Sequence, residues 1–130
     1  MANIEIPYET LGGEPALRAL VDKFYGLMDE VPAYYVIRKL HPADLSGSRN
    51  KLFMFLSGWL GGPQLYVEKF GHPRLKMRHF PFPIGVAERD AWLACMQQAL
   101  DECGVSAAFK AWLMRSLFQT ADWMRNQDAQ

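Results

Sequence analysis

Apolar residues recur at intervals of three and four over much of this chain, which is the spacing of one face of an α-helix. The first such segment begins after Gly12-Gly13, and its pattern predicts a helix that ends near Glu30. The apolar face of this predicted helix consists of Leu17, Leu20, Val21, Phe24 and Met28. A short turn over residues 32–37 follows, and His41-Pro42 stops it.

The second apolar repeat follows Asp44, which has the side chain of a helix N-cap. Gly61-Gly62-Pro63 ends the helix that this repeat predicts. Its inner face is expected to carry Leu45, Ser48, Leu52, Phe55, Leu56 and Trp59.

Helical periodicity returns in the last third of the chain. Gly104 closes one predicted helix there. Its apolar face is expected to carry Trp92, Met96, Ala99, Leu100 and Cys103. Ser106 is expected to cap the last helix, with an apolar face of Phe109, Leu113, Leu117, Ala121 and Met124. No run alternates apolar and polar residues for long enough to predict a strand, so the expected class is all-α.

The segment 64–85 differs from the helices around it. It holds Pro73, Pro81 and Pro83 among several basic residues, and these leave room for only one or two short helices. A loop-rich stretch of this length inside a compact domain usually exists for function. The search for a binding or catalytic residue therefore concentrates on this segment.

The composition predicts one compact domain over residues 1–130, because 130 residues with 50% apolar side chains are too few for two domains. The 14 basic and 14 acidic side chains cancel, which argues against nucleic acid as the main partner. No stretch approaches the roughly 20 apolar residues of a membrane span. The first residues lack the pattern of a secretory signal, so we expect a cytoplasmic protein.

The two cysteines, Cys95 and Cys103, are expected on one helix, where eight residues correspond to about 12 Å of rise. That separation is too long for a disulfide. We therefore expect two reduced and mostly buried thiols.

Three histidines are present, and none has Asp, Glu or Cys at the spacing of a metal cage. This leaves a site with one histidine ligand, and haem iron is the common cofactor that needs only one ligand from the protein. His79 is the strongest candidate, because Pro81 and Pro83 hold the chain after it extended. Its second ring nitrogen could donate to the carbonyl of Leu75, one turn back. Taken alone, however, a histidine in such a place is more often a surface or capping residue.

Three runs of sequence carry a family resemblance. They are Gly61-Gly62-Pro63-Gln64-Leu65-Tyr66, the run from Gly71-His72-Pro73 through Arg78-His79 to Phe82, and Arg89-Asp90-Ala91-Trp92-Leu93-Ala94-Cys95-Met96. In order and spacing they resemble the truncated haemoglobins of the second group. The resemblance implies a truncated globin fold, a two-over-two α-helical sandwich with a reduced first helix, around haem b (iron protoporphyrin IX). It also implies that His79 binds the iron.

The resemblance further implies that polar side chains face the haem on the side opposite His79. Tyr25, His41 and Trp92 stand at the matching positions, although the family more often has Tyr or Phe where this chain has His41. Each has an ordinary alternative: a core tyrosine, a solvated turn residue and a tryptophan that only packs. If all three face the iron, hydrogen bonds in a dry pocket would stabilise bound oxygen and slow its release. Tyr25 or His41 could also ligate ferric iron when no external ligand is present.

Further residues are expected to line the cofactor. Arg78, Tyr66 and Lys69 are the candidates for its carboxylates, and Arg78 is favoured because its planar guanidinium suits a carboxylate. A solvated basic loop is the alternative for this group. Ser48 would leave an opening for ligand entry, and Leu52 would fill space. The other expected contacts of the haem are Phe55, Leu75, Phe82 and Met96.

The leading functional hypothesis is a haem protein that binds O2, NO or CO, with NO dioxygenation or peroxidase-like turnover of peroxide as possible reactions. Both reactions need an external reductase, because the chain has no flavin or nicotinamide motif. A second hypothesis is a non-enzymatic sensor or store that works with a partner protein. A third is a haem-free helical module, against which stand the buried polar groups that would lack a partner. A monomer or weak homodimer is expected.

Overall fold

The computed structural model describes residues 6–71 and 85–123, and in the second range it describes the side chains as far as residue 120. Helices make up most of these two ranges, and neither contains a strand. In chain order they are α1 (Pro7–Leu11), α2 (Gly13–Glu30), the 3-10 turn η1 (Pro32–Tyr34), α3 (Tyr35–Arg38), α4 (Ser46–Trp59), α5 (Leu65–Phe70), α7 (Val86–Glu102) and α8 (Ala107–Trp123).

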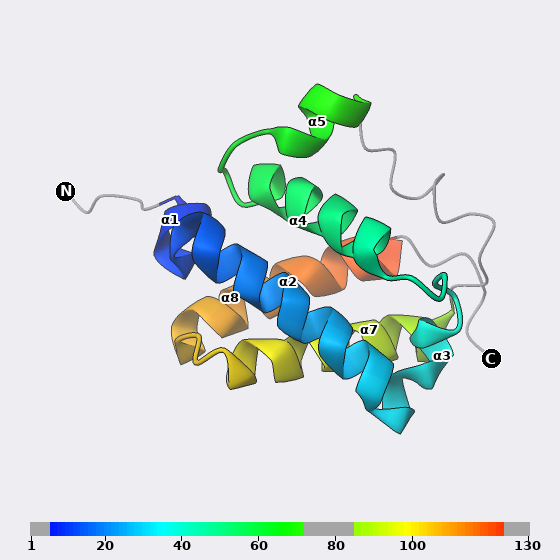
Figure 1. The fold of residues 1–130 in the computed structure, drawn as a ribbon. Helices are drawn as coiled ribbons and strands as arrows, with labels where there is room; N and C mark the ends of the chain where they lie inside the picture. The colour runs from blue at the N-terminus through cyan, green and yellow to red at the C-terminus, as the bar shows by residue number, and fades with distance from the viewer. Residues whose placement is uncertain (1–5, 72–84, 124–130) are drawn as a thin grey trace.

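Helix α2 is the centre of the arrangement. It packs against α4 on one side and against α7 on the other, and α7 in turn packs against α8 (Figure 1). Helix α5 lies on α4, while η1 and α3 pack against α2 and α7. Both helix pairs around α2 thus depend on its buried face.

The limits and the face predicted for the first long helix are confirmed. Helix α2 ends at Glu30, and all the residues predicted for its apolar face are buried. Tyr25 and Leu27 are buried as well. Gly12 has a φ of 125°, a conformation that L side chains rarely adopt, and it lets the chain turn from α1 into α2.

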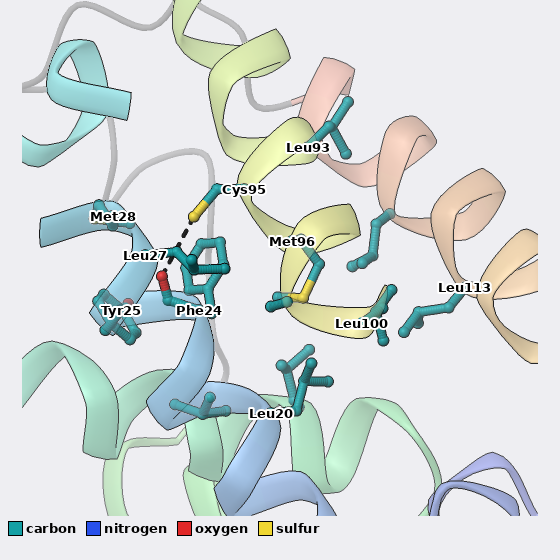
Figure 2. Packing of buried hydrophobic residues seen from close by; sticks show 14 of the residues in the cluster. Leu20, Phe24, Tyr25, Leu27, Met28, Leu93, Cys95, Met96, Leu100 and Leu113 are labelled. Atoms are coloured by element: carbon teal, nitrogen blue, oxygen red, sulfur yellow. Dashed lines mark hydrogen bonds between the residues drawn. The ribbon is translucent and has the colours of Figure 1, made fainter. Parts of the chain in front are cut away.

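The core forms where α2 meets α7 and α8 (Figure 2). Phe24 is fully buried, and its backbone carbonyl accepts a hydrogen bond from the Cys95 thiol, with Sγ and O 3.3 Å apart. Met96 and Leu100 extend this cluster along α7, and Leu113 extends it onto α8. The interior of the fold is therefore apolar at the α2–α7 contact.

The prediction for the next helix was wrong in two details. Asp44 accepts a hydrogen bond from the Ser46 backbone N–H at 2.9 Å, but the N-cap position belongs to Leu45, one residue later. Leu45 and Leu56 are buried as expected, but the other buried positions are Phe53, Ser57 and Leu60. The expected residues Ser48, Leu52, Phe55 and Trp59 form a neighbouring, half-buried row. The buried face therefore differs from the predicted one, because α4 packs on two helices. Phe53 contacts Arg18 of α2, and Phe55 contacts Tyr66 of α5.

Helices α7 and α8 follow the pattern with one correction, and the expected Ala121 and Met124 lie outside the described side chains. The Gly85 backbone N–H donates to Glu88 Oε1 at 2.7 Å and starts α7. Ser106 Oγ accepts from the Phe109 backbone N–H at 3.3 Å, as expected for a cap. Cys95 is buried, but Cys103 is exposed, because it lies at the C-cap of α7 beside the turn at Gly104. The expectation of two mostly buried thiols was therefore wrong for Cys103.

The double-glycine turn after α4 brings the chain back against α1. The backbone N–H of Tyr8 donates to the carbonyl of Leu60 at 2.9 Å. A Cβ at Gly62 would lie 2.5 Å from the Tyr8 ring, so only glycine allows this approach. Gly61 has a φ of 92°, which again favours glycine. This corner sets the start of α5.

Within the two described ranges, no helix combines the length and the apolar character needed to cross a membrane.

Candidate ligand-binding site

A row of aromatic rings joins the two central helices. The Phe24 ring lies between Tyr25 and Trp92, with centroid distances of 5.0 Å and 5.1 Å and edge-to-face geometry. His41, after α3, lies edge-to-face on the other side of Tyr25 at 5.8 Å. The structure therefore brings together Tyr25, His41 and Trp92, the residues that the resemblance assigns to the ligand side.

Tyr25 keeps its proton in this position. Its side chain is 5% exposed, and burial raises the pKa of the phenol above its ordinary value. The nearby charge of Arg49 opposes that rise in pKa, but burial is the larger cause. A neutral phenol can donate a hydrogen bond, so Tyr25 is held in its donor form.

Two hydrogen-bond donors of the row lack an acceptor inside the described structure. Neither the Tyr25 hydroxyl nor the Trp92 indole N–H makes a hydrogen bond with a residue in the ranges 6–71 and 85–123. The Tyr25 side chain is buried and the Trp92 side chain is half-buried. Both groups therefore remain available to donate to a polar ligand.

His41 presents a different atom. Its Nδ1 lies 2.8 Å from the carbonyl oxygen of Ile37, and a carbonyl can only accept. Nδ1 therefore carries the hydrogen, and in the neutral ring Nε2 carries a lone pair. Only the cationic ring could donate from Nε2.

The expected cofactor-lining residues on α4 and α5 lie around a second aromatic contact. Ser48 and Leu52 are half-buried on α4. Phe55 meets the buried Tyr66 edge-to-face, with centroids 6.2 Å apart. Lys69 is exposed. These side chains share the α4–α5 side of the fold.

Met96 lies elsewhere among the expected contacts, because it is fully buried in the core on α7. The predicted iron ligand His79 and the expected contacts Leu75, Arg78 and Phe82 lie outside the described residues. Their roles stay predictions.

Sequence reasoning missed Arg49. Its Nε is buried and has no hydrogen-bond partner in the structure. A signal was present in the sequence, because Arg49 stands four residues after Leu45 and four before Phe53, both of which are buried. A charge at that spacing interrupts an apolar face.

The helical architecture and the aromatic row together define a globin. Residues 7–126 match the family model described as bacterial-like globin, and the chain belongs to this family. Its place is among the truncated, 2-on-2 haemoglobins of the second group, which confirms the resemblance and the all-α fold inferred from the sequence. Globins of this family bind haem and, through it, small gaseous ligands such as O2.

Three similar proteins support this assignment. Group 2 truncated haemoglobin YjbI of Bacillus subtilis is 42% identical over 121 residues, which cover 93% of this chain and 89% of that protein. The group II 2-on-2 haemoglobin of the plant pathogen Agrobacterium tumefaciens is 46% identical, with a TM-score of 0.92 over 98% of each chain. The truncated oxygen-avid haemoglobin from Bacillus subtilis is 41% identical, with a TM-score of 0.86 over 94% of this chain and all of that one (100%).

Proposed function

We propose that this chain binds haem b and retains O2 strongly, with Tyr25 and Trp92 as the hydrogen-bond donors to the ligand. The observation that carries the proposal is the pair of unpaired donors on either side of the Phe24 ring. These residues fit haem, because a polar ligand on its iron would supply the acceptor that both donors lack in the described structure. When bound, haem supplies an iron atom with a position for O2, NO or CO.

Two such donors have a large effect on ligand release. A hydrogen bond to a charged or strongly polarised group contributes about 1.5–3 kcal/mol, and each 1.4 kcal/mol is about tenfold in an equilibrium constant. We therefore expect slow oxygen dissociation. The description of a 41% identical haemoglobin from Bacillus subtilis as oxygen-avid supports this expectation.

The remaining roles follow the resemblance for His79 and residue type and position for the others. His79 binds the iron on the opposite side, with its ring oriented by the Leu75 carbonyl. Tyr66, Lys69 and Arg78 hold the haem carboxylates. With the hydrogen of its neutral ring on Nδ1, His41 is assigned no donor role toward the ligand.

Strong retention suits a redox reaction better than transport. The reaction class we propose is NO dioxygenation, in which NO and O2 form nitrate with the uptake of one electron. A separate reductase has to supply that electron, because the sequence has no flavin or nicotinamide motif. Tyr25 and Trp92 contribute by holding O2 in place until NO arrives.

Oxygen dissociation measured by stopped flow tests the donor assignment. Tyr25→Phe and Trp92→Phe should each raise the dissociation rate about tenfold or more, since each removes one donor. Tyr34→Phe is the matched control, because its hydroxyl bonds Gln98 Oε1 at 2.6 Å and lies outside the aromatic row. Rates in both site variants equal to that of the control would overturn the proposal.

The haem ligand needs its own test. His79→Gly should abolish the five-coordinate ferrous spectrum, and added imidazole should restore it. An unchanged spectrum without imidazole would contradict ligation by His79. Nitrate formation over many turnovers with an electron supply would separate an enzyme from a store, which gives at most one nitrate per haem.

A further inference from the structure

One arginine side chain, that of Arg38, holds the turn between α3 and α4. Its Nε donates to Asp29 Oδ1 at 2.8 Å. Its two terminal nitrogens donate to the backbone carbonyls of Pro42 and Ala43, each at 3.0 Å. The side chain is 19% exposed, so most of it is removed from water. All three nitrogens of the planar guanidinium are therefore used, whereas a simple surface ion pair would leave at least one of them in water.

The three acceptors connect this turn to the helix that carries Tyr25. Asp29 lies in the last turn of α2, four residues after Tyr25, so the two residues start from the same side of that helix. Pro42 and Ala43 are the two residues that directly follow His41. The guanidinium therefore ties the backbone just after His41 to the end of α2.

The His41 ring is fixed by further contacts on both sides. Its Nδ1 donates to the Ile37 carbonyl at 2.8 Å, and its backbone N–H donates to the Arg38 carbonyl at 3.0 Å. The ring meets Tyr25 edge-to-face, with centroids 5.8 Å apart and 79° between the ring planes. Such a pair favours one relative orientation of the two rings. A displaced turn would therefore remove the ring that supports one side of the Tyr25 phenol.

We propose that Arg38 is a positioning residue for the ligand-binding site. It holds His41 against Tyr25, and His41 in turn keeps the Tyr25 phenol in the orientation from which it donates to a bound ligand. Arg38 acts only through His41. The inference rests on the proposed function, in which Tyr25 is a donor. It adds a residue of α3 to the site, and it assigns His41 a supporting role in place of a donor role.

The first experiment observes the two rings directly. Proton NMR of the ferrous CO form, which is diamagnetic, should show nuclear Overhauser cross-peaks between the His41 and Tyr25 rings. Arg38→Gln should weaken these cross-peaks at least about twofold, since the turn is no longer tied to α2. The cross-peaks between Phe24 and Tyr25, whose centroids are 5.0 Å apart within α2, are the internal reference and should stay unchanged. Equal cross-peaks in Arg38→Gln and the unchanged protein would overturn the inference.

The second experiment measures oxygen dissociation by stopped flow. Arg38→Gln should raise the rate about two- to tenfold, the range that corresponds to the loss of one edge-to-face aromatic pair. His41→Ala should raise it by a similar factor. In the His41→Ala background, Arg38→Gln should add little, because residues that act through one another are not additive. Independent, multiplied increases in the double variant would overturn the inference.

Two further variants separate the three contacts from charge alone. Arg38→Lys keeps a positive charge beside Asp29 but lacks the planar group that also reaches two carbonyls. It should therefore behave as Arg38→Gln does, and it serves the same test should Arg38→Gln fail to fold. Lys39→Gln is the matched control, because Lys39 is the exposed cation next in the chain, and it should change neither measurement. Wild-type behaviour of Arg38→Lys, or changes in Lys39→Gln as large as those in Arg38→Gln, would overturn the inference.

Failure of this inference can be told from failure of the proposed function. If Tyr25→Phe leaves oxygen dissociation unchanged, the donor role of Tyr25 is wrong, and the inference is overturned with it. If Tyr25→Phe speeds dissociation while Arg38→Gln leaves either the cross-peaks or the rate unchanged, this inference alone is overturned.

Discussion

Helices α2 and α4 are the two long elements that meet along one side of the fold, and they bury different kinds of side chain. The buried face of α2 is apolar apart from the Tyr25 hydroxyl. The corresponding face of α4 also holds a buried serine, Ser57, and the charge of Arg49. The difference indicates that α2 contributes an almost wholly apolar face, while α4 also buries polar atoms, of which Ser57 Oγ is hydrogen-bonded and Arg49 Nε is not.

The largest effect is expected from the α2 side. Phe24→Ala should lower the free energy of unfolding by about 3–5 kcal/mol, because it leaves a cavity between the Tyr25 and Trp92 rings. Urea denaturation measures this loss. Phe118→Ala is the control, since the Phe118 side chain is 45% exposed, and it should cost far less. Equal losses in the two variants would contradict the role of α2 as the centre of the core.

The α4 side should respond to the loss of one hydrogen bond. Ser57 Oγ donates to the Pro63 carbonyl at 2.8 Å, and the side chain is fully buried. Ser57→Ala should therefore cost about 1–3 kcal/mol in the free energy of unfolding. Ser116→Ala on α8 is the control, because its hydroxyl has no hydrogen-bond partner in the described part of the chain. A control loss as large as that of Ser57→Ala would refute this explanation.

Stability at alkaline pH tests the burial of the Cys95 thiol, which donates a hydrogen bond from α7 to the Phe24 carbonyl of α2. Burial raises the pKa of the Cys95 thiol to about 12, so the folded chain keeps a proton that the unfolded chain loses above about pH 8.5. The unfolded state then binds fewer protons, and stability falls as pH rises, by up to about 1.4 kcal/mol per pH unit. Urea denaturation between pH 8.5 and 10 should show a shallower slope for Cys95→Ala than for Cys103→Ala. Identical slopes would argue against the buried thiol as the cause.

The smallest expected effect has the opposite sign. Arg49→Met should raise the free energy of unfolding by about 1 kcal/mol, because it replaces a half-buried arginine, whose buried Nε lacks a hydrogen-bond partner, with an apolar side chain. Arg18→Met is the control on the other side of the α2–α4 contact. Arg18 lies 3.8 Å over the Phe53 ring and bonds Asn50, so its loss should leave stability unchanged or slightly lower. Destabilisation by Arg49→Met would show that α4 gives up no stability at this position.

The same contrast explains which features the sequence predicts. The pattern of α2 is regular, so its limits and buried face could be read directly, and the motifs after the double glycine were specific enough to indicate the family. On α4 the sequence predicted a buried row that includes Leu52, Phe55 and Trp59, but these side chains are half-buried. Helix α4 packs on both α2 and α5, and its half-buried residues are also apolar, so the sequence pattern did not separate the two rows.

Within the site, residue type predicted which side chains lie together, but not their hydrogen bonds or the burial of a charged residue's atoms. Tyr25, His41 and Trp92 were selected from the sequence, and the structure brings them together. The hydrogen bond from His41 to Ile37 and the burial of Arg49 Nε depend on side-chain directions, which spacing alone does not determine.

The contact between Tyr8 and Gly62 has a consequence for protein engineering. The Tyr8 ring covers the turn that precedes α5. Helix α1 therefore holds a turn that lies more than 50 residues later in the chain. Gly62→Ala would push the Tyr8 ring away from this turn without replacing any residue of the ligand-binding side. A purification tag or fusion joined close to residue 8 would strain the same contact.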